Sequence, residues 1–158
     1  MKILVTYRFI AITLAIITCS VSAQAQEFWG KTKYGMPSSA VRALFGNQLK
    51  SDPVEEPMAS LSMTTSFCNV DFDVQFVFSY DKLLLVRLVG KSRESEPIPL
   101  PICTLDAYLS AFGKPTSAKE NDSVIDYMFR SGDTVVNLNL WKPPALVIIH
   151  YSFKRSDL

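Results

Sequence analysis

The sequence predicts an α+β fold made of two repeats, each a helix followed by an antiparallel meander of strands, with both helices packed on one face of an antiparallel sheet. The first observation is a self-match between residues 36–46 and 103–113, in which Leu44-Phe45-Gly46 aligns with Ala111-Phe112-Gly113. Such self-similarity is typical of an internal repeat. The second is that each segment is followed by runs in which polar and apolar residues alternate, the pattern of strands with one buried face.

The N-terminal segment has the parts of a secretory signal peptide. Lys2 and Arg8 supply positive charge, residues 9–19 are almost wholly apolar, and small residues allow cleavage after Ala25 or after Ala23. The apolar run is well short of the ~20 residues that a membrane-spanning helix needs. We therefore expect a periplasmic or secreted protein of the bacterial envelope, with no stable membrane insertion after cleavage.

Residues 26–158 are expected to form one α+β domain, whose two repeats cover about residues 28–90 and 102–154. The expected elements of the first repeat are a helix at 38–46, a surface loop at 47–57, strands at 60–67, 72–78 and 83–89, and a hairpin turn at 79–82. Apolar residues at spacings of three and four indicate the helix, with Ser38 or Ser39 as its N-cap and Gly46 at its end.

The second repeat is expected to follow an exposed connector at residues 90–101, which contains mixed charges and three prolines. Its expected elements are a helix at 104–112, a polar loop at 119–123, and strands at 125–130, 134–141 and 146–153. Thr104 is the candidate N-cap, and Gly113 with Pro115 just beyond marks the end of the helix.

The cysteines predict one covalent link. Cys19 lies near the end of the apolar run, but Thr18 precedes it where a lipidation signal normally has a smaller residue, so a lipoprotein is the lesser alternative to simple export. Removal of the signal peptide leaves Cys68 and Cys103. An even number of cysteines in an oxidising compartment predicts a disulfide between them, the alternative being two buried thiols.

Charge argues against a nucleic-acid partner. Removing residues 1–25 takes away Lys2 and Arg8 and no acidic residue, which leaves 14 basic against 15 acidic side chains and a net charge of about −1. A near-neutral domain without a basic run has no field to hold a phosphate backbone.

Catalytic and metal-binding residues are also sparse. General acid-base catalysis most often uses histidine, and His150 is the one histidine of the chain. A zinc site needs more nitrogen or sulfur ligands than one histidine and two bridged cysteines supply. The sequence therefore predicts a protein that is not an enzyme and that has no cofactor and no metal site.

Strand alternation predicts an open sheet face opposite the helices. The row expected to face the core is Val74, Phe76, Phe78, Leu84, Val86 and Leu88, followed by Ile125, Tyr127, Phe129, Val136, Leu138, Leu140, Val147, Ile149 and Tyr151. The residues expected to face outward are Asp71, Asp73, Gln75, Arg87, Asp126, Met128, Arg130, Asn137, Asn139, Trp141 and His150.

Within the outward set, Trp141 and Arg130 are expected to be the centre of a protein-binding patch, because Trp and Arg are enriched among the residues that dominate binding energy. The other members of this candidate patch are Met128, Asn137, Asn139 and His150. The alternative is that Trp141 packs under the turn at residues 142–144.

The repeat pattern resembles the fold of the β-lactamase inhibitor protein, whose single-unit relatives include the small lipoprotein of the outer-membrane barrel assembly machine. The resemblance covers nearly all of residues 28–153 and is carried by the strand order and by short structural motifs. These are Gly35-Met36-Pro37 leading into Val41 and Leu44-Phe45-Gly46, and Leu109 with Phe112-Gly113-Lys114-Pro115. The chain departs from the assembly lipoprotein in its poor lipidation signal and its two units, and no inhibitory or assembly residue carries over by position.

The function expected from these observations is that of a secreted or periplasmic protein-binding module of the inhibitor or immunity type. The alternative is an envelope-assembly or maintenance factor with a structural role. The partner in either case is another protein, which the sequence does not identify.

Overall fold

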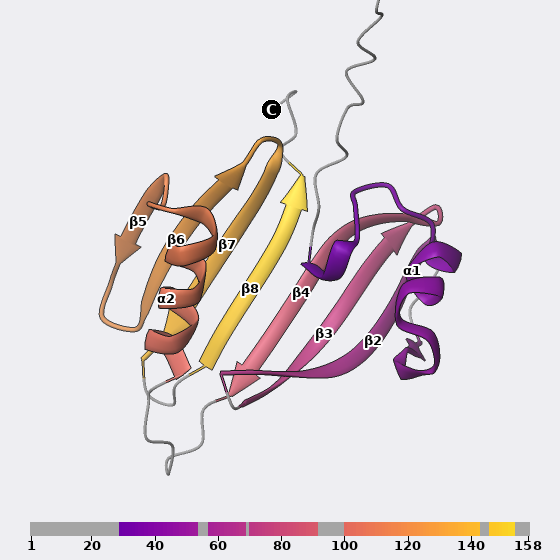
Figure 1. Ribbon diagram of the computed structural model, residues 1–158, viewed down its shortest axis with the longest axis horizontal. Helices are drawn as coiled ribbons and strands as arrows, with labels where there is room; N and C mark the ends of the chain where they lie inside the picture. The colour runs from indigo at the N-terminus through magenta and orange to yellow at the C-terminus, as the bar shows by residue number, and fades with distance from the viewer. Residues whose placement is uncertain (1–28, 54–56, 69, 92–99, 143–145, 154–158) are drawn as a thin grey trace, which may run out of the picture.

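The computed structural model describes residues 29–53, 57–68, 70–91, 100–142 and 146–153. Its main feature is one 8-stranded antiparallel sheet with the strand order β1-β2-β3-β4-β8-β7-β6-β5 (Figure 1). The predicted signal peptide and its cleavage sites lie outside the described residues. None of the described helices is long and apolar enough to span a bilayer.

The sheet is built from two runs of strands, each preceded by a short helix. The elements are η1 (Trp29–Lys31), α1 (Ser38–Phe45), η2 (Gly46–Gln48), β1 (Lys50–Asp52), β2 (Met58–Phe67), β3 (Val70–Ser79), β4 (Lys82–Lys91), α2 (Leu100–Phe112), β5 (Ser117–Glu120), β6 (Val124–Ser131), β7 (Thr134–Trp141) and β8 (Leu146–Phe153). The runs meet in the middle of the sheet, where β4 pairs with β8 from Leu85 against Ser152 to Lys91 against Leu146.

The predicted fold class, α+β with two helix-plus-meander repeats, is wrong. The described chain is predominantly strand, in one continuous sheet, and its two α-helices span only 8 and 13 residues. Parts of the two segments expected as loops, 47–57 and 119–123, belong instead to the edge strands β1 and β5. Polar side chains are tolerated there because an edge strand is held by backbone pairing and stays exposed to water.

The edge strand β1 shows how such a segment is fixed. Asp52 accepts hydrogen bonds from the hydroxyls of Ser60 and Ser62 on β2, at 3.0 and 2.8 Å. These bonds tie β1 to its neighbour, and the strand ends just before Pro53, which cannot donate to a ladder. Residues 47–57 were therefore wrongly predicted to be entirely loop.

Helix starts differ from the sequence prediction. The cap of α1 comes from the β3–β4 turn, where the Asp81 carboxylate accepts the backbone N–H of Ser38 at 2.9 Å. Hydrogen bonding by the Ser38 side chain, and second by this backbone N–H, lowers the pKa of Asp81. The second helix, α2, begins at Leu100 rather than after Thr104, because Pro101 falls in the first turn, where a missing N–H costs no helical hydrogen bond.

The core lies on the sheet face that carries the helices. Its fully buried members include Phe72, Phe76 and Phe78 on β3 and Phe129 on β6. Leu84 was predicted to join them, but a register shift at Val77/Phe78 places Leu83 opposite Phe78. Leu83 is therefore fully buried, whereas Leu84 is half-buried.

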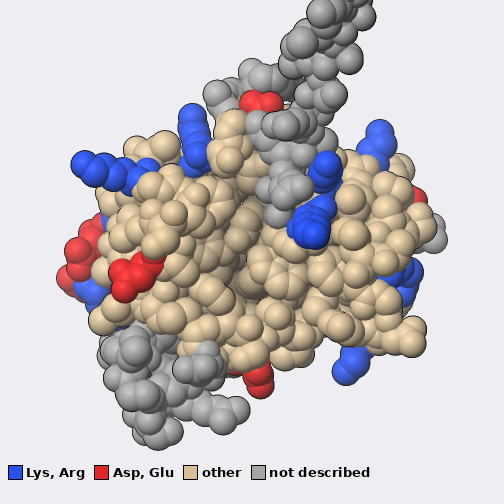
Figure 2. Space-filling model, in the orientation of Figure 1, with Lys and Arg blue, Asp and Glu red and all other residues tan. Residues whose placement is uncertain are grey.

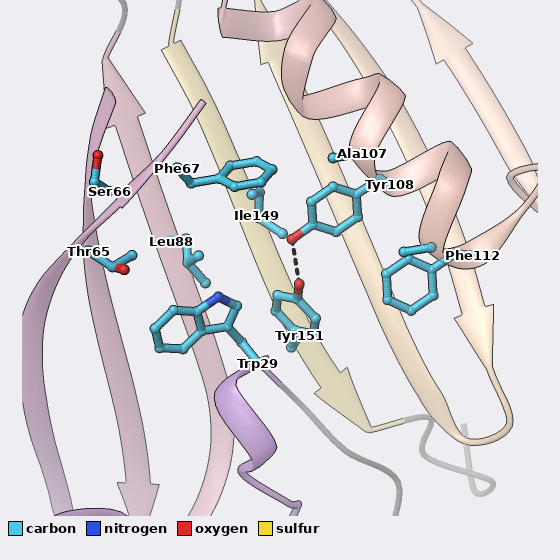
Figure 3. A pocket seen from close by; sticks show the side chains of 11 residues that line it. Trp29, Thr65, Ser66, Phe67, Leu88, Ala107, Tyr108, Phe112, Ile149 and Tyr151 are labelled. Atoms are coloured by element: carbon cyan, nitrogen blue, oxygen red, sulfur yellow. Dashed lines mark hydrogen bonds between the residues drawn. The ribbon is translucent and has the colours of Figure 1, made fainter. Parts of the chain in front are cut away.

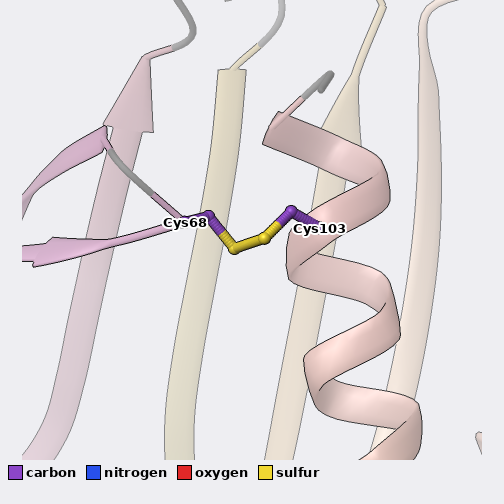
Figure 4. The surroundings of a disulfide bond; sticks show 2 residues. All are labelled: Cys68 and Cys103. Carbon is purple, nitrogen blue, oxygen red and sulfur yellow. A yellow bond between two sulfur atoms is a disulfide. The ribbon is translucent and has the colours of Figure 1, made fainter. Parts of the chain in front are cut away.

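The predicted pairing of Cys68 with Cys103 is confirmed. A disulfide joins the end of β2 to the first turns of α2, across a Cα–Cα distance of 6.0 Å (Figure 4). It links segments that are 35 residues apart in sequence. The bridge therefore holds α2 beside the end of β2.

Candidate functional site

The sheet face opposite the helices is the first candidate site. In Figure 1 the helices α1 and α2 and the turn η1 all lie on the near side of the sheet. Among the described residues, no helix covers the other side. We call this surface the open face: the side chains of β2–β4 and β6–β8 that point away from the core.

The pairing register brings four outward residues together in one row across the open face. Met128 on β6 lies opposite Asn137 on β7, Asn137 lies opposite His150 on β8, and His150 lies opposite Arg87 on β4. Directly opposed side chains in an antiparallel pair have Cβ atoms roughly 4.5–5.5 Å apart. Three of the residues predicted for the patch are therefore close neighbours, and Arg87 extends their row.

The remaining predicted residues lie in other rows of the same face. Arg130, opposite Val135, is exposed at one end of the β6–β7 pair, and Trp141, opposite Val124, is 41% exposed at the other end, so the two are not neighbours. Asn139 donates a hydrogen bond to Asp126 across the β6–β7 pair at 2.6 Å. The structure thus places all six residues on one face, but Asn139 already has a partner within it.

The centre of the open face carries a positive group with unused hydrogen-bonding capacity. The Nε of Arg87 is buried and has no hydrogen-bond partner among the described residues. His150 beside it is half-buried, and its pKa is lowered, first by burial and second by the positive charge of Arg87. The pair therefore places a positive charge and an imidazole ring side by side near the middle of the open face.

Apolar side chains flank this polar row, and the sequence analysis did not single them out. Val77, Leu85, Val89 and Ile148 point to the open face and are half-buried there. They alternate with the core residues along their strands, and this alternation could have identified them from the sequence. The middle of the open face is therefore mixed apolar and cationic rather than simply polar.

A second candidate site is an apolar cleft on the opposite, helix-covered face (Figure 3). Its floor is Leu88 of β4 and Ile149 of β8, and its volume is about 410 Å³. Five aromatic residues line it: Trp29, Phe67, Tyr108, Phe112 and Tyr151. Sequence reasoning missed this cleft because its walls come from η1, β2 and α2, which meet only in the folded chain.

Two hydroxyl groups meet inside this cleft. The phenol oxygens of Tyr108 and Tyr151 are hydrogen-bonded to one another between the aromatic walls (Figure 3). Burial raises the pKa of Tyr108 strongly and that of Tyr151 to about 12. Both groups therefore remain protonated at neutral pH.

Charge is scarce around the cleft. Figure 2 shows the helix-covered side, where the hollow beside α2 is mostly uncharged and Lys and Arg lie mainly toward the rim. Among the described residues that line the cleft there is no lysine, arginine, aspartate or glutamate. Within the part of the chain that the structure describes, no three His, Cys, Asp or Glu side chains form a group that could hold a metal ion.

Comparison with known proteins gives little guidance. No family model matches the chain, and no curated protein matches it. Among solved structures, a DUF4309 family protein, YjgB, from Bacillus subtilis subsp. subtilis strain 168, is similar with a TM-score of 0.47 and 13% sequence identity. The match covers 75% of this chain and 78% of that one. At this distance the similarity carries no argument about function.

Proposed function

We propose that the protein is an exported, non-enzymatic module that binds another protein through the open face of its sheet. The observation that carries the proposal is that none of the described helices covers one face of the sheet, and that this face presents half-buried apolar side chains around the Arg87–His150 pair. Trp141 and Arg130 lie on the same face, and both residue types are enriched where interface energy concentrates.

The composition of the open face fits protein recognition better than membrane or nucleic-acid binding. Protein interfaces combine an apolar centre with arginine and aromatic side chains and a polar rim. The open face has apolar Val77, Leu85 and Ile148 near its middle, whereas the aspartates of β3 are exposed. We place the module in the periplasm or outside the cell on the strength of the signal-peptide pattern.

Within this proposal, an inhibitor or immunity-type protein is the favoured role. Its support is the sequence resemblance of the helix-capping segments to the β-lactamase inhibitor protein; the two-repeat fold that this resemblance also implied is not the fold of the chain. The partner identity decides the role. Recovery of a soluble hydrolase from the envelope would support inhibition. Recovery of outer-membrane barrel components would instead support an assembly role.

The test is the affinity of open-face variants for the partner once it has been identified by pull-down. Trp141→Ala and Arg130→Ala should each weaken binding at least tenfold with little change in melting temperature, because both side chains are exposed. The matched control is Leu109→Ala, which removes an exposed apolar side chain from α2 on the other side of the sheet. Unchanged affinity in both open-face variants would refute the proposal.

A further inference from the structure

The cleft beside α2 has the features of a small-molecule site. Ligand pockets have volumes of about 300–1,000 Å³ and combine mostly apolar walls with a few placed polar groups. This cleft, at about 410 Å³, lies within that range. It is separate from the open face, because the sheet itself lies between the two surfaces.

The polar groups of the cleft define what such a ligand must offer. Two phenol hydroxyls that bond to one another use one of their two protons, so the second O–H is left to donate. Tyr108 and Tyr151 are both buried, so this second O–H costs free energy unless it finds an acceptor in the cleft. A ligand oxygen with a free lone pair would satisfy it.

The walls define the rest of the ligand. Phe112 stacks on Tyr108 on the α2 side, with ring centroids 5.6 Å apart, while Trp29 and Phe67 line the cleft from η1 and β2. Aromatic walls favour a flat apolar body. The described lining residues carry no charge, so a charged ligand would bring an uncompensated charge into a low-dielectric site, and a neutral ligand is favoured.

We propose that this cleft binds a small, neutral, aromatic molecule that carries one carbonyl or ether oxygen, with its ring between the aromatic walls and its oxygen accepting from the Tyr108–Tyr151 hydroxyl pair. The disulfide sets the width of the site. Cys68 directly follows Phe67 of one wall, and Cys103 lies one helical turn before Ala107 of the other. This site does not depend on the protein-binding role of the open face.

The experiment uses protein purified after expression of the full sequence. The chain has 2 tryptophans, so a Trp141→Phe background leaves Trp29 in the cleft wall as the sole tryptophan reporter. The probe is N-phenyl-naphthylamine, a neutral aromatic fluorophore. The competitors are acetylnaphthalene and its isosteric hydrocarbon isopropenylnaphthalene, which differ only in the carbonyl oxygen.

We expect the fluorescence of the probe to increase on binding and the emission of Trp29 to change. We expect the ketone to displace the probe at about a fivefold lower concentration than the hydrocarbon. This factor corresponds to one net hydrogen bond of about 1 kcal/mol. The double variant Tyr108→Phe/Tyr151→Phe should bind the probe but lose the preference for the ketone. Replacing both partners of a buried hydrogen bond by groups of the same shape is nearly neutral for stability, so this variant should fold.

A blocking variant tests the position of the site. Ala111→Phe places a ring in the mouth of the cleft from α2 and should reduce probe binding at least tenfold, while Leu109→Phe adds a ring to the same helix outside the cleft and should not. Probe binding that is absent from the parent protein, or unchanged in Ala111→Phe, overturns the site. Equal binding of ketone and hydrocarbon overturns the assigned ligand chemistry.

Discussion

Along β3, residues that face the helices and residues that face away alternate on one backbone. Phe72 and Phe76 are completely buried, Asp71 and Asp73 are exposed, and Gln75 is half-buried. The covered face therefore contributes most of the hydrophobic stabilisation, since its apolar area is removed from water. The open face buries less apolar area. Under the proposed function, stability therefore depends mainly on one side of these strands and protein binding on the other.

Truncation of a core residue should give the largest difference in stability loss between the two faces. Phe76 packs against Phe45 and Trp29, with ring centroids 5.2 and 6.1 Å away, and is fully buried. Phe76→Ala should lower the free energy of unfolding by about 3–5 kcal/mol, as burial is lost and a cavity forms. The adjacent open-face change Gln75→Ala should cost less than about 1 kcal/mol. Urea denaturation of both variants measures the difference, and equal losses would break the comparison.

Removal of the disulfide should cause the next largest loss of stability. The bridge closes a loop of 35 residues, for which the chain-entropy model gives about 3–4 kcal/mol. The double variant Cys68→Ser/Cys103→Ser should lose this stability in thermal or urea unfolding, and reducing agent should have no further effect on it. Two free thiols titrated in the unreduced, denatured parent protein would contradict the bridge.

Overpacking at Gly90 should cause an intermediate loss of stability. A Cβ at this position on the covered side of β4 would lie 2.6 Å from two ring carbons of Phe72, and that ring is fully buried. Gly90→Ala should therefore cost about 1–3 kcal/mol. Shrinking the opposing ring in Gly90→Ala/Phe72→Leu should make the combined loss smaller than the sum of the two single losses. Additive losses in urea denaturation would mean that the two residues do not clash.

The smallest expected effect belongs to His150 on the open face. Its pKa in the folded protein is below the ordinary value of 6.5, so the unfolded chain binds the proton more tightly. As the pH falls through about 6.5, the unfolded state takes up more protons and the free energy of unfolding decreases. His150→Gln should show a shallower loss between about pH 7 and pH 5 than the parent. Parallel stability profiles would contradict the lowered pKa.

Much of this contrast was predictable from local patterns. Alternation indicated the inward and outward sets of β3, β7 and β8, because the two faces of a strand have a period of two. The two cysteines that remain after removal of the predicted signal peptide indicated the bridge. These signals are local or countable, so a single sequence is enough to show them.

What escaped prediction depends on partners distant in sequence. The edge strand β1 exists because β2 pairs with it, and the cap of α1 is supplied by Asp81 from a hairpin turn. The burial of Leu83 in place of Leu84 follows from a register shift that alternation alone does not reveal. The cleft with Tyr108 and Tyr151 arises only when α2 is held over β8.

The most direct test of the division between the faces is site-specific photocrosslinking in cells that express the protein. A photoreactive phenylalanine replaces Asn137 on the open face or Leu109 on the exposed side of α2, with one sample for each position. We predict a discrete crosslinked partner from residue 137 that is lost on adding Trp141→Ala and Arg130→Ala, and no such product from residue 109. The same product from residue 109, or a product from residue 137 that survives both substitutions, would contradict the account.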